Sequence, residues 1–196
     1  MDNLRRFILV FTCIIFVTLS VCGFLLAKSF SKSAKTENVD LTINSYNETI
    51  YVLNDANVSI NGGDISSSSS NAVRNNGTGI VEILNGYFLS KNYDCILNYS
   101  TGTISIKNGE IVSNLDAAIY NSNANGTLIL GEKDGEASVT EPSIIGKTYG
   151  VYNKGTFNYY DGIIKGPSSK SIYGNVSEIE DGYSIIKTDN GTYFLH

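Results

Sequence analysis

The chain has 196 residues, 42% of them hydrophobic, and a formal net charge of −5, which is enough material for one domain with a buried core plus a tail or an anchor. The acidic balance argues against nucleic acid as a partner, because phosphate binding needs a basic surface. The single histidine is the last residue, His196, which argues against Ser-His or Cys-His nucleophile pairs and against multi-histidine metal sites.

An apolar run without a charge, FILVFTCIIFVTLSVCGFLLA, occupies residues 7–27. As a helix it would span the hydrocarbon core of a bilayer, which is about 30 Å thick. A cleaved signal peptide is a weaker alternative, because its apolar region is usually only about 7–15 residues long. A lipoprotein site at Cys22 is also weaker, because the bulky Val21 stands where a small residue is wanted. We therefore predict a signal-anchor transmembrane helix over residues 1–28.

The charges that flank the apolar run are nearly balanced, with two arginines before it and three lysines shortly after it. The positive-inside rule therefore does not set an orientation. The composition of the remaining chain favours the outside of the cell. We predict a single-pass cell-membrane protein whose C-terminal domain is extracellular and is joined to the anchor by a polar linker at residues 29–38.

After the linker the chain becomes rich in Asn, Ser, Thr, Gly, Ile and Tyr, and short alternating runs predict β-strands rather than helices. Four such runs begin at Val58, Val81, Ile104 and Leu128, which are 23, 23 and 24 residues apart. A fixed period in the twenties is typical of a solenoid. We predict three short strands in each repeat, which together form one coil of a parallel β-helix, over residues 39–182.

A short phrase marks one corner of each predicted coil: a small residue, an apolar residue, any residue and Asn. The asparagines of four coils are Asn75, Asn98, Asn121 and Asn153. Stacked at one corner, their side-chain amides would donate and accept along the stack and satisfy nearby backbone groups. We therefore predict a structural asparagine ladder. Cys95 holds the small position in its coil, which predicts a buried thiol rather than a disulfide.

The run KDGEASVTEPSIIGKTYGVYNKGTFNYYDGIIKG, at residues 133–166, resembles the rungs of bacterial right-handed parallel β-helix proteins of the pectin-lyase-like superfamily, in particular repeat-containing cell-surface proteins. The resemblance extends over residues 57–179. It implies an all-β fold, a single-stranded right-handed parallel β-helix of about five coils. Because the superfamily includes polysaccharide lyases, hydrolases, adhesins and passive stalks, the resemblance implies a fold and not one activity.

The two ends of a β-helix must be covered, because open strand edges would pair with other chains. Residues 183–196 predict a hairpin that caps the last coil, with its turn at Asp189-Asn190-Gly191. Residues 41–53 predict an incomplete first coil at the other end. A β-sandwich is the competing all-β fold, but its turns, which come about every 8–12 residues, do not produce a 23-residue period.

The fourth repeat is longer than the others. It extends over 32 residues from Ile119 to Val151 against the usual 23, and the extra residues lie in GEKDGEASVTEPS, at 131–143. Insertions in solenoids bulge from one face and often carry a binding function. Four tyrosines near this inserted loop are candidates for stacking on sugar rings, with burial in the core as the alternative: Tyr149, Tyr152, Tyr159 and Tyr160.

Catalysis in this fold would need carboxylates in the same phase on consecutive coils. Asp64 and Glu110 share a phase, but Tyr87 stands between them, and Asp94 aligns with uncharged residues on both neighbouring coils. We therefore predict no catalytic residues, no cofactor and no dedicated metal site. The acidic residues of the inserted loop are calcium candidates, although they lack the spacing of a dedicated calcium loop: Glu132, Asp134 and Glu136.

These features lead to one functional hypothesis and one alternative. The first is a membrane-anchored extracellular β-helix module with a structural or adhesive role at the cell surface. Its expected partners are the membrane, through residues 7–27, and a glycan or protein of the cell surface or of a host. The alternative is a carbohydrate-active enzyme of the polysaccharide lyase or hydrolase kind, or its degenerate relative. The lack of histidine in the repeats favours the first hypothesis.

Overall fold

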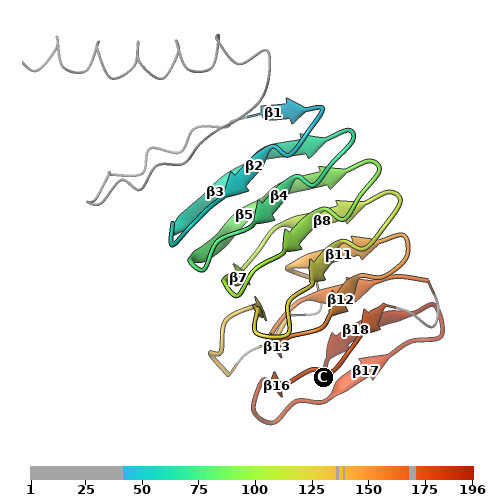
Figure 1. Cartoon of the computed structure of the whole chain (residues 1–196). Coiled ribbons are helices and arrows are strands. Elements are labelled where there is room, and N and C mark those ends of the chain that lie inside the picture. Colours follow the sequence, from blue (N-terminus) through green and yellow to red (C-terminus); the bar gives the residue numbers. More distant parts are fainter. Residues whose placement is uncertain (1–41, 136, 139, 168–170) are drawn as a thin grey trace, which may run out of the picture.

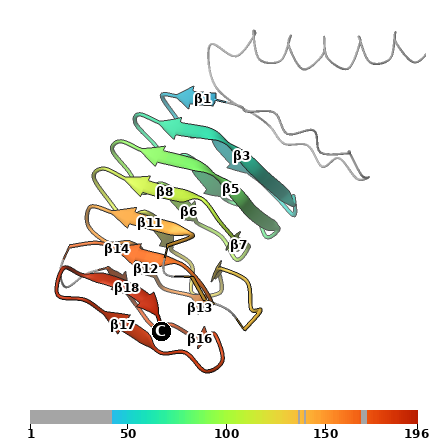
Figure 2. The same cartoon turned by 180° about the vertical axis from the view of Figure 1, so that it is seen from behind.

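The computed structural model describes residues 42–135, 137–138, 140–167 and 171–196. The predicted transmembrane helix and the linker lie outside these residues. Within the described ranges all the regular elements are β-strands, and no helix is long and apolar enough to cross a membrane. The strands wind into a parallel β-solenoid of about six turns (Figure 1, Figure 2).

One wall of the solenoid is a six-stranded parallel sheet, here called sheet A, to which each turn contributes one short strand. Its strands are β15 (Ile172–Tyr173), β12 (Val151–Asn153), β9 (Ile119–Asn121), β6 (Ile96–Asn98), β4 (Val73–Asn75) and β2 (Ile50–Val52). In the four inner strands the first and last residues are buried and the middle residue is partly exposed. This alternation explains the repeated phrase, since the apolar residue and the asparagine both face inward.

The other two walls belong to a twelve-stranded sheet, here called sheet B. Its strands are β1 (Thr42–Ser45), β3 (Val58–Ser67), β5 (Ile80–Ser90), β7 (Thr103–Ile106), β8 (Glu110–Ser113), β10 (Thr127–Leu130), β11 (Ser143–Gly146), β13 (Thr156–Tyr159), β14 (Ile163–Lys165), β16 (Glu178–Ile179), β17 (Ile185–Lys187) and β18 (Thr192–Leu195). The long strand β5 pairs with β7 through its first half and with β8 through its second half. Later turns interrupt the strand at this corner, so that one turn contributes three short strands.

Glycine forms the corner between the two walls of sheet B. Gly86 and Gly109 have positive φ angles of 133° and 104°. A Cβ atom on Gly109 would lie 2.5 Å from the carbonyl oxygen of Gly86, one turn away. Because a side chain fits neither the backbone conformation nor the space, glycine recurs at this corner in successive repeats.

The turns stack in register around an apolar core. Val81, Ile104, Leu128 and Phe157 occupy equivalent positions on neighbouring strands, and all four are fully buried. Burial of such side chains is the main favourable contribution to folding. Cys95 is also fully buried and is a free thiol, as the sequence predicts.

The asparagine ladder predicted from the repeat is present. Asn75 Nδ2 donates to Asn98 Oδ1 at 3.3 Å, and the next two steps, to Asn121 and then to Asn153, measure 3.0 and 2.8 Å. Each amide also donates to a carbonyl of its own turn, as Asn98 Nδ2 does to Gly102 O at 2.8 Å. The four side chains are buried. The ladder therefore joins each turn both to itself and to its neighbour.

The solenoid has about six turns rather than the predicted five, because residues expected to form an incomplete coil form a turn. They contain β1, which pairs with β3, and β2, which pairs with β4 in the register of the later turns. At the other end β18 runs antiparallel to both β14 and β17, and its Leu195 is buried in the core. This antiparallel pair covers the edge that β14 would otherwise expose.

Candidate functional site

The outward positions of sheet A form a row along the solenoid. The middle residues of its strands are paired in register from turn to turn. In chain order they are Tyr51, Arg74, Leu97, Tyr120, Tyr152 and Tyr173. The last three turns therefore present tyrosine at the same place, and Tyr149, just before β12, packs beside them. We call Tyr120, Tyr149, Tyr152 and Tyr173 the tyrosine patch.

The rings of the tyrosine patch pack against one another. Tyr152 and Tyr173 are stacked, with centroids 4.2 Å apart and planes 14° apart. Tyr120 and Tyr149 meet Tyr152 edge to face, at centroid distances of 4.9 and 5.0 Å. Both arrangements are favoured for aromatic pairs. The packing fixes the rings in place before any ligand binds.

A cation already lies over two of these rings. The ammonium of Lys154 is 5.2 Å from the ring centroid of Tyr120 and 5.7 Å from that of Tyr152. These distances are within the range of cation–π attraction. A hydrogen bond with Tyr120 raises the pKa of Lys154, so that the side chain stays charged. The tyrosine patch thus accommodates a positive charge.

A hollow of about 250 Å³ opens beside the tyrosine patch. Its lining combines three rings of the patch with two carboxylates and a hydroxyl: Tyr120, Tyr149, Tyr152, Asp94, Asp116 and Thr148. Rings of this kind provide apolar contact, and carboxylates accept hydrogen bonds. The hollow therefore offers both contact types to a small polar ligand or to part of a larger one.

The two carboxylates lie at the corner between sheet B and sheet A, where Ser113 ends β8 and the chain turns toward β9. Ser113, which is buried, accepts the N–H of Asp116 at 2.9 Å through its Oγ. Asp116 Oδ1 in turn accepts the hydroxyl of Thr148 at 2.9 Å, and Asp94 Oδ1 accepts the N–H of Ala117 at 3.2 Å. These bonds hold a carboxylate from each of two successive turns at the rim of the same hollow.

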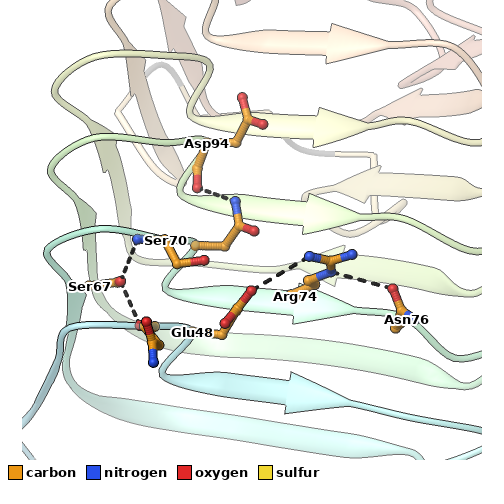
Figure 3. Close-up of polar contacts among 8 residues, drawn as sticks. Glu48, Ser67, Ser70, Arg74, Asn76 and Asp94 are labelled. Atoms are coloured by element: carbon orange, nitrogen blue, oxygen red, sulfur yellow. Dashed lines mark hydrogen bonds and ion pairs between the residues drawn. The ribbon is translucent and has the colours of Figure 1, made fainter. Parts of the chain in front are cut away.

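The two carboxylates give the hollow a negative character. Burial, and secondly the negative charge of Asp116, raise the pKa of the Asp94 carboxyl to about 7. Among the described residues no ion pair includes either carboxylate. Arg74, on the same sheet, is paired with Glu48 at 3.5 Å and donates to Asn76 at 3.4 Å (Figure 3).

The structure divides the four predicted glycan-binding tyrosines into two pairs. Tyr149 and Tyr152 belong to the tyrosine patch. Tyr159 is fully buried, and its hydroxyl donates to Gly162 O at 2.7 Å. Tyr160 is 7% exposed, and its hydroxyl donates to Glu178 at 2.8 Å. The prediction of a sugar-stacking role for Tyr159 and Tyr160 is therefore wrong, because their rings are buried.

The described part of the inserted loop does not project freely into solvent. The N–H of Gly135 donates to Glu180 Oε1 at 2.9 Å, and the N–H of Ser138 donates to Asp161. The ammonium of Lys133 pairs with Glu178. These acceptors belong to later turns, so the loop is fastened along the side of the solenoid.

Two of the three calcium candidates of the inserted loop lie within the described residues. Glu132 pairs with Lys107 at 2.6 Å. Asp134 lines a second hollow, of about 230 Å³, together with Asp161. Glu136 lies outside the described residues. Within the part of the chain that the structure describes, no group of three or more Asp, Glu, His or Cys side chains is arranged to hold a metal ion.

The chain is thus a parallel β-solenoid with an aromatic and acidic hollow on one wall. Comparisons with protein-family models, with curated proteins and with solved structures find no match to it. The site has to be interpreted from its own chemistry.

Proposed function

We propose that this protein is a membrane-anchored β-solenoid displayed at the cell surface, where it binds carbohydrate through the tyrosine patch and the adjoining hollow. The main support is the meeting of three tyrosine rings with two carboxylates around one hollow. Sugar rings present apolar C–H faces and peripheral hydroxyls, which match aromatic faces and carboxylate acceptors respectively. Because the rings are already fixed by mutual packing, a ligand would lose little binding energy in ordering them.

Binding of glycans by the full-length protein in nanodiscs tests this proposal. We expect Tyr152→Ala to weaken the binding of a responsive glycan roughly tenfold, because the ring both lines the hollow and packs on its neighbours. Tyr46→Ala is the matched control, since Tyr46 is 74% exposed and lies outside the tyrosine patch. Equal losses in the two variants, or no binding to any glycan of an array, would contradict the proposal.

The proposal includes the finer assignment of the fold and the placement in the cell. The repeat resembles right-handed β-helices of the pectin-lyase-like superfamily, and the uncharged run at 7–27 supports an anchor. Protease treatment of intact cells tests the outward placement. The domain should be digested without lysis, and protection until lysis would show that the orientation is wrong.

A carbohydrate-active enzyme is the second candidate, and one observation favours it. Asp94, whose pKa is raised to about 7, lies beside Asp116 in the same hollow. A carboxyl with a raised pKa next to a second carboxyl is the arrangement used for general acid catalysis of glycoside cleavage. New reducing ends from neutral polysaccharides, lost in Asp94→Asn, would support this candidate. A rate that persists in Asp94→Asn would contradict it.

A further inference from the structure

The hollow beside the tyrosine patch carries the negative charge of two carboxylates. Asp94 and Asp116 both line it, and none of the ion pairs among the described residues includes either of them. Hydrogen bonds from Ala117 and Thr148 hold the two carboxyls beside the hollow. A ligand that brings a positive charge into the hollow would therefore relieve the repulsion between them.

The tyrosine rings that line the hollow also favour a positively charged ligand. Lys154 lies over the rings of Tyr120 and Tyr152, which shows that their faces can accept an ammonium group. Lys154 itself is exposed and does not line the hollow. The ring of Tyr149 completes the aromatic lining next to the carboxylates. Rings and carboxylates around one space form a suitable site for an organic ammonium.

We propose that the hollow binds the protonated amine of an amino sugar, so that the preferred ligand is a glycan containing unacetylated hexosamine. This inference rests on the proposed carbohydrate-binding function and specifies its ligand class. Acetylation would remove the positive charge and leave the two carboxylates unpaired. A uronic acid would add a third negative charge to the same space, which like-charge repulsion disfavours.

Binding should release a proton. Asp94, with a pKa of about 7, carries a proton in part of the molecules at neutral pH, and an ammonium in the hollow favours its ionised form. Asp116 is the other carboxyl that lines the hollow. Calorimetric titration in two buffers with different ionisation enthalpies measures this release. Non-specific attraction of the ligand to the acidic surface would not release this proton.

The test compares three hexasaccharides with the full-length protein in nanodiscs, at about pH 6.5, where the amine of a sugar is largely protonated. The probes are β-1,4-linked glucosamine, its fully N-acetylated counterpart and a glucuronate-containing hexasaccharide. We expect the glucosamine hexamer to bind at least roughly tenfold more tightly than the acetylated one. We also expect Asp116→Asn to remove most of this preference. Asp116 is exposed and its bonds can be kept by an amide, so this variant should fold normally.

Glu110→Gln is the matched control, because it removes one negative charge from an exposed position on sheet B, outside the hollow. It should keep the preference for the glucosamine hexamer. An equal loss in Glu110→Gln and Asp116→Asn would overturn the inference, since it would show attraction to the net charge alone. Binding of the acetylated hexamer without a preference for the amine would also overturn it, while leaving the proposed function intact. Failure of all three hexamers to bind would also overturn the inference, whereas binding of another glycan of the array would still support the proposed function.

Discussion

Asp94 connects three consecutive turns. Its carbonyl oxygen accepts the side-chain amide of Asn71 at 2.7 Å, and its Oδ1 accepts the N–H of Ala117 at 3.2 Å. These bonds come from the turns on either side and keep the carboxyl next to Asp116. Burial raises the pKa of the Asp94 carboxyl, and the negative charge of Asp116 beside it raises it further.

We predict that Asp94→Asn stabilises the protein at about pH 8 and changes its stability little at about pH 4. The folded pKa of about 7 lies above the usual 3.8. The protonated carboxyl therefore contributes stability at low pH that is lost as the pH rises through the folded value. Asparagine keeps the hydrogen bond to Ala117 and carries no charge. The expected gain is on the order of 2 kcal/mol after allowance for partial exposure.

Urea unfolding of the unsubstituted protein and of Asp94→Asn, each at about pH 4 and about pH 8, measures this difference in stability. The exposed Asp189→Asn is the control and should change the free energy of unfolding by less than about 0.5 kcal/mol. A stabilisation by Asp94→Asn that is equal at the two pH values would show that the raised pKa of Asp94 is not its cause.

The sequence predicts some of these residues better than others. The burial of Tyr159 was predictable, because Tyr159 is in register with Leu130 and Ile106, two apolar residues that face the core. The proximity of Asp94 to Asp116 was not predictable, because a comparison of equivalent positions in the repeat aligns Asp94 with Ala117. Asp116 stands one position earlier, and only the path of the chain around the corner brings its carboxyl to the same hollow.

At the scale of the element, the asparagine ladder and the inserted loop differ in how far the repeat determines them. Every ladder bond joins equivalent residues of adjacent turns, so the period alone predicts it. The bonds that hold the inserted loop come from partners outside the period, such as Glu180, 45 residues after Gly135. No sequence pattern near Gly135 indicates so distant a partner. The sequence therefore predicted where the loop is inserted but not that it is fastened to the solenoid.

We predict that Asn98→Ala destabilises the protein by about 2–4 kcal/mol. The substitution removes donors to Gly102 O and Asn121 Oδ1 and the acceptor of Asn75 Nδ2, all in a buried place that water does not reach. Equilibrium unfolding in urea measures the loss. Asn114→Ala, at an exposed asparagine that directly follows β8 and is not part of the ladder, should cost less than about 0.5 kcal/mol. Similar losses in the two variants would mean that the ladder does not stabilise the stack.

At the scale of the whole molecule, the solenoid is a one-dimensional stack whose stability depends on contacts between neighbouring turns. Its described strands pair in parallel over most of its length. The last strand, β18, instead pairs antiparallel with β14. Leu195 of β18 enters the core, and β17 pairs along its outer side. The antiparallel pair thus provides both core contacts and a cover for the edge of β14 (Figure 2).

We predict that deletion of residues 183–196 makes the protein self-associate. The deletion exposes the N–H and C=O groups of β14 that now pair with β18, and a parallel sheet edge of this kind pairs readily with another chain. Light scattering coupled to size-exclusion chromatography, over a series of concentrations, should show a mass that rises with concentration relative to the full chain under the same conditions. Ile186→Lys, on the outer strand β17 and 36% exposed, is the control and should behave like the full chain. A deletion variant that remains as monodisperse as the full chain at all concentrations would show that β18 contributes core contacts alone and that the edge of β14 does not need a cover.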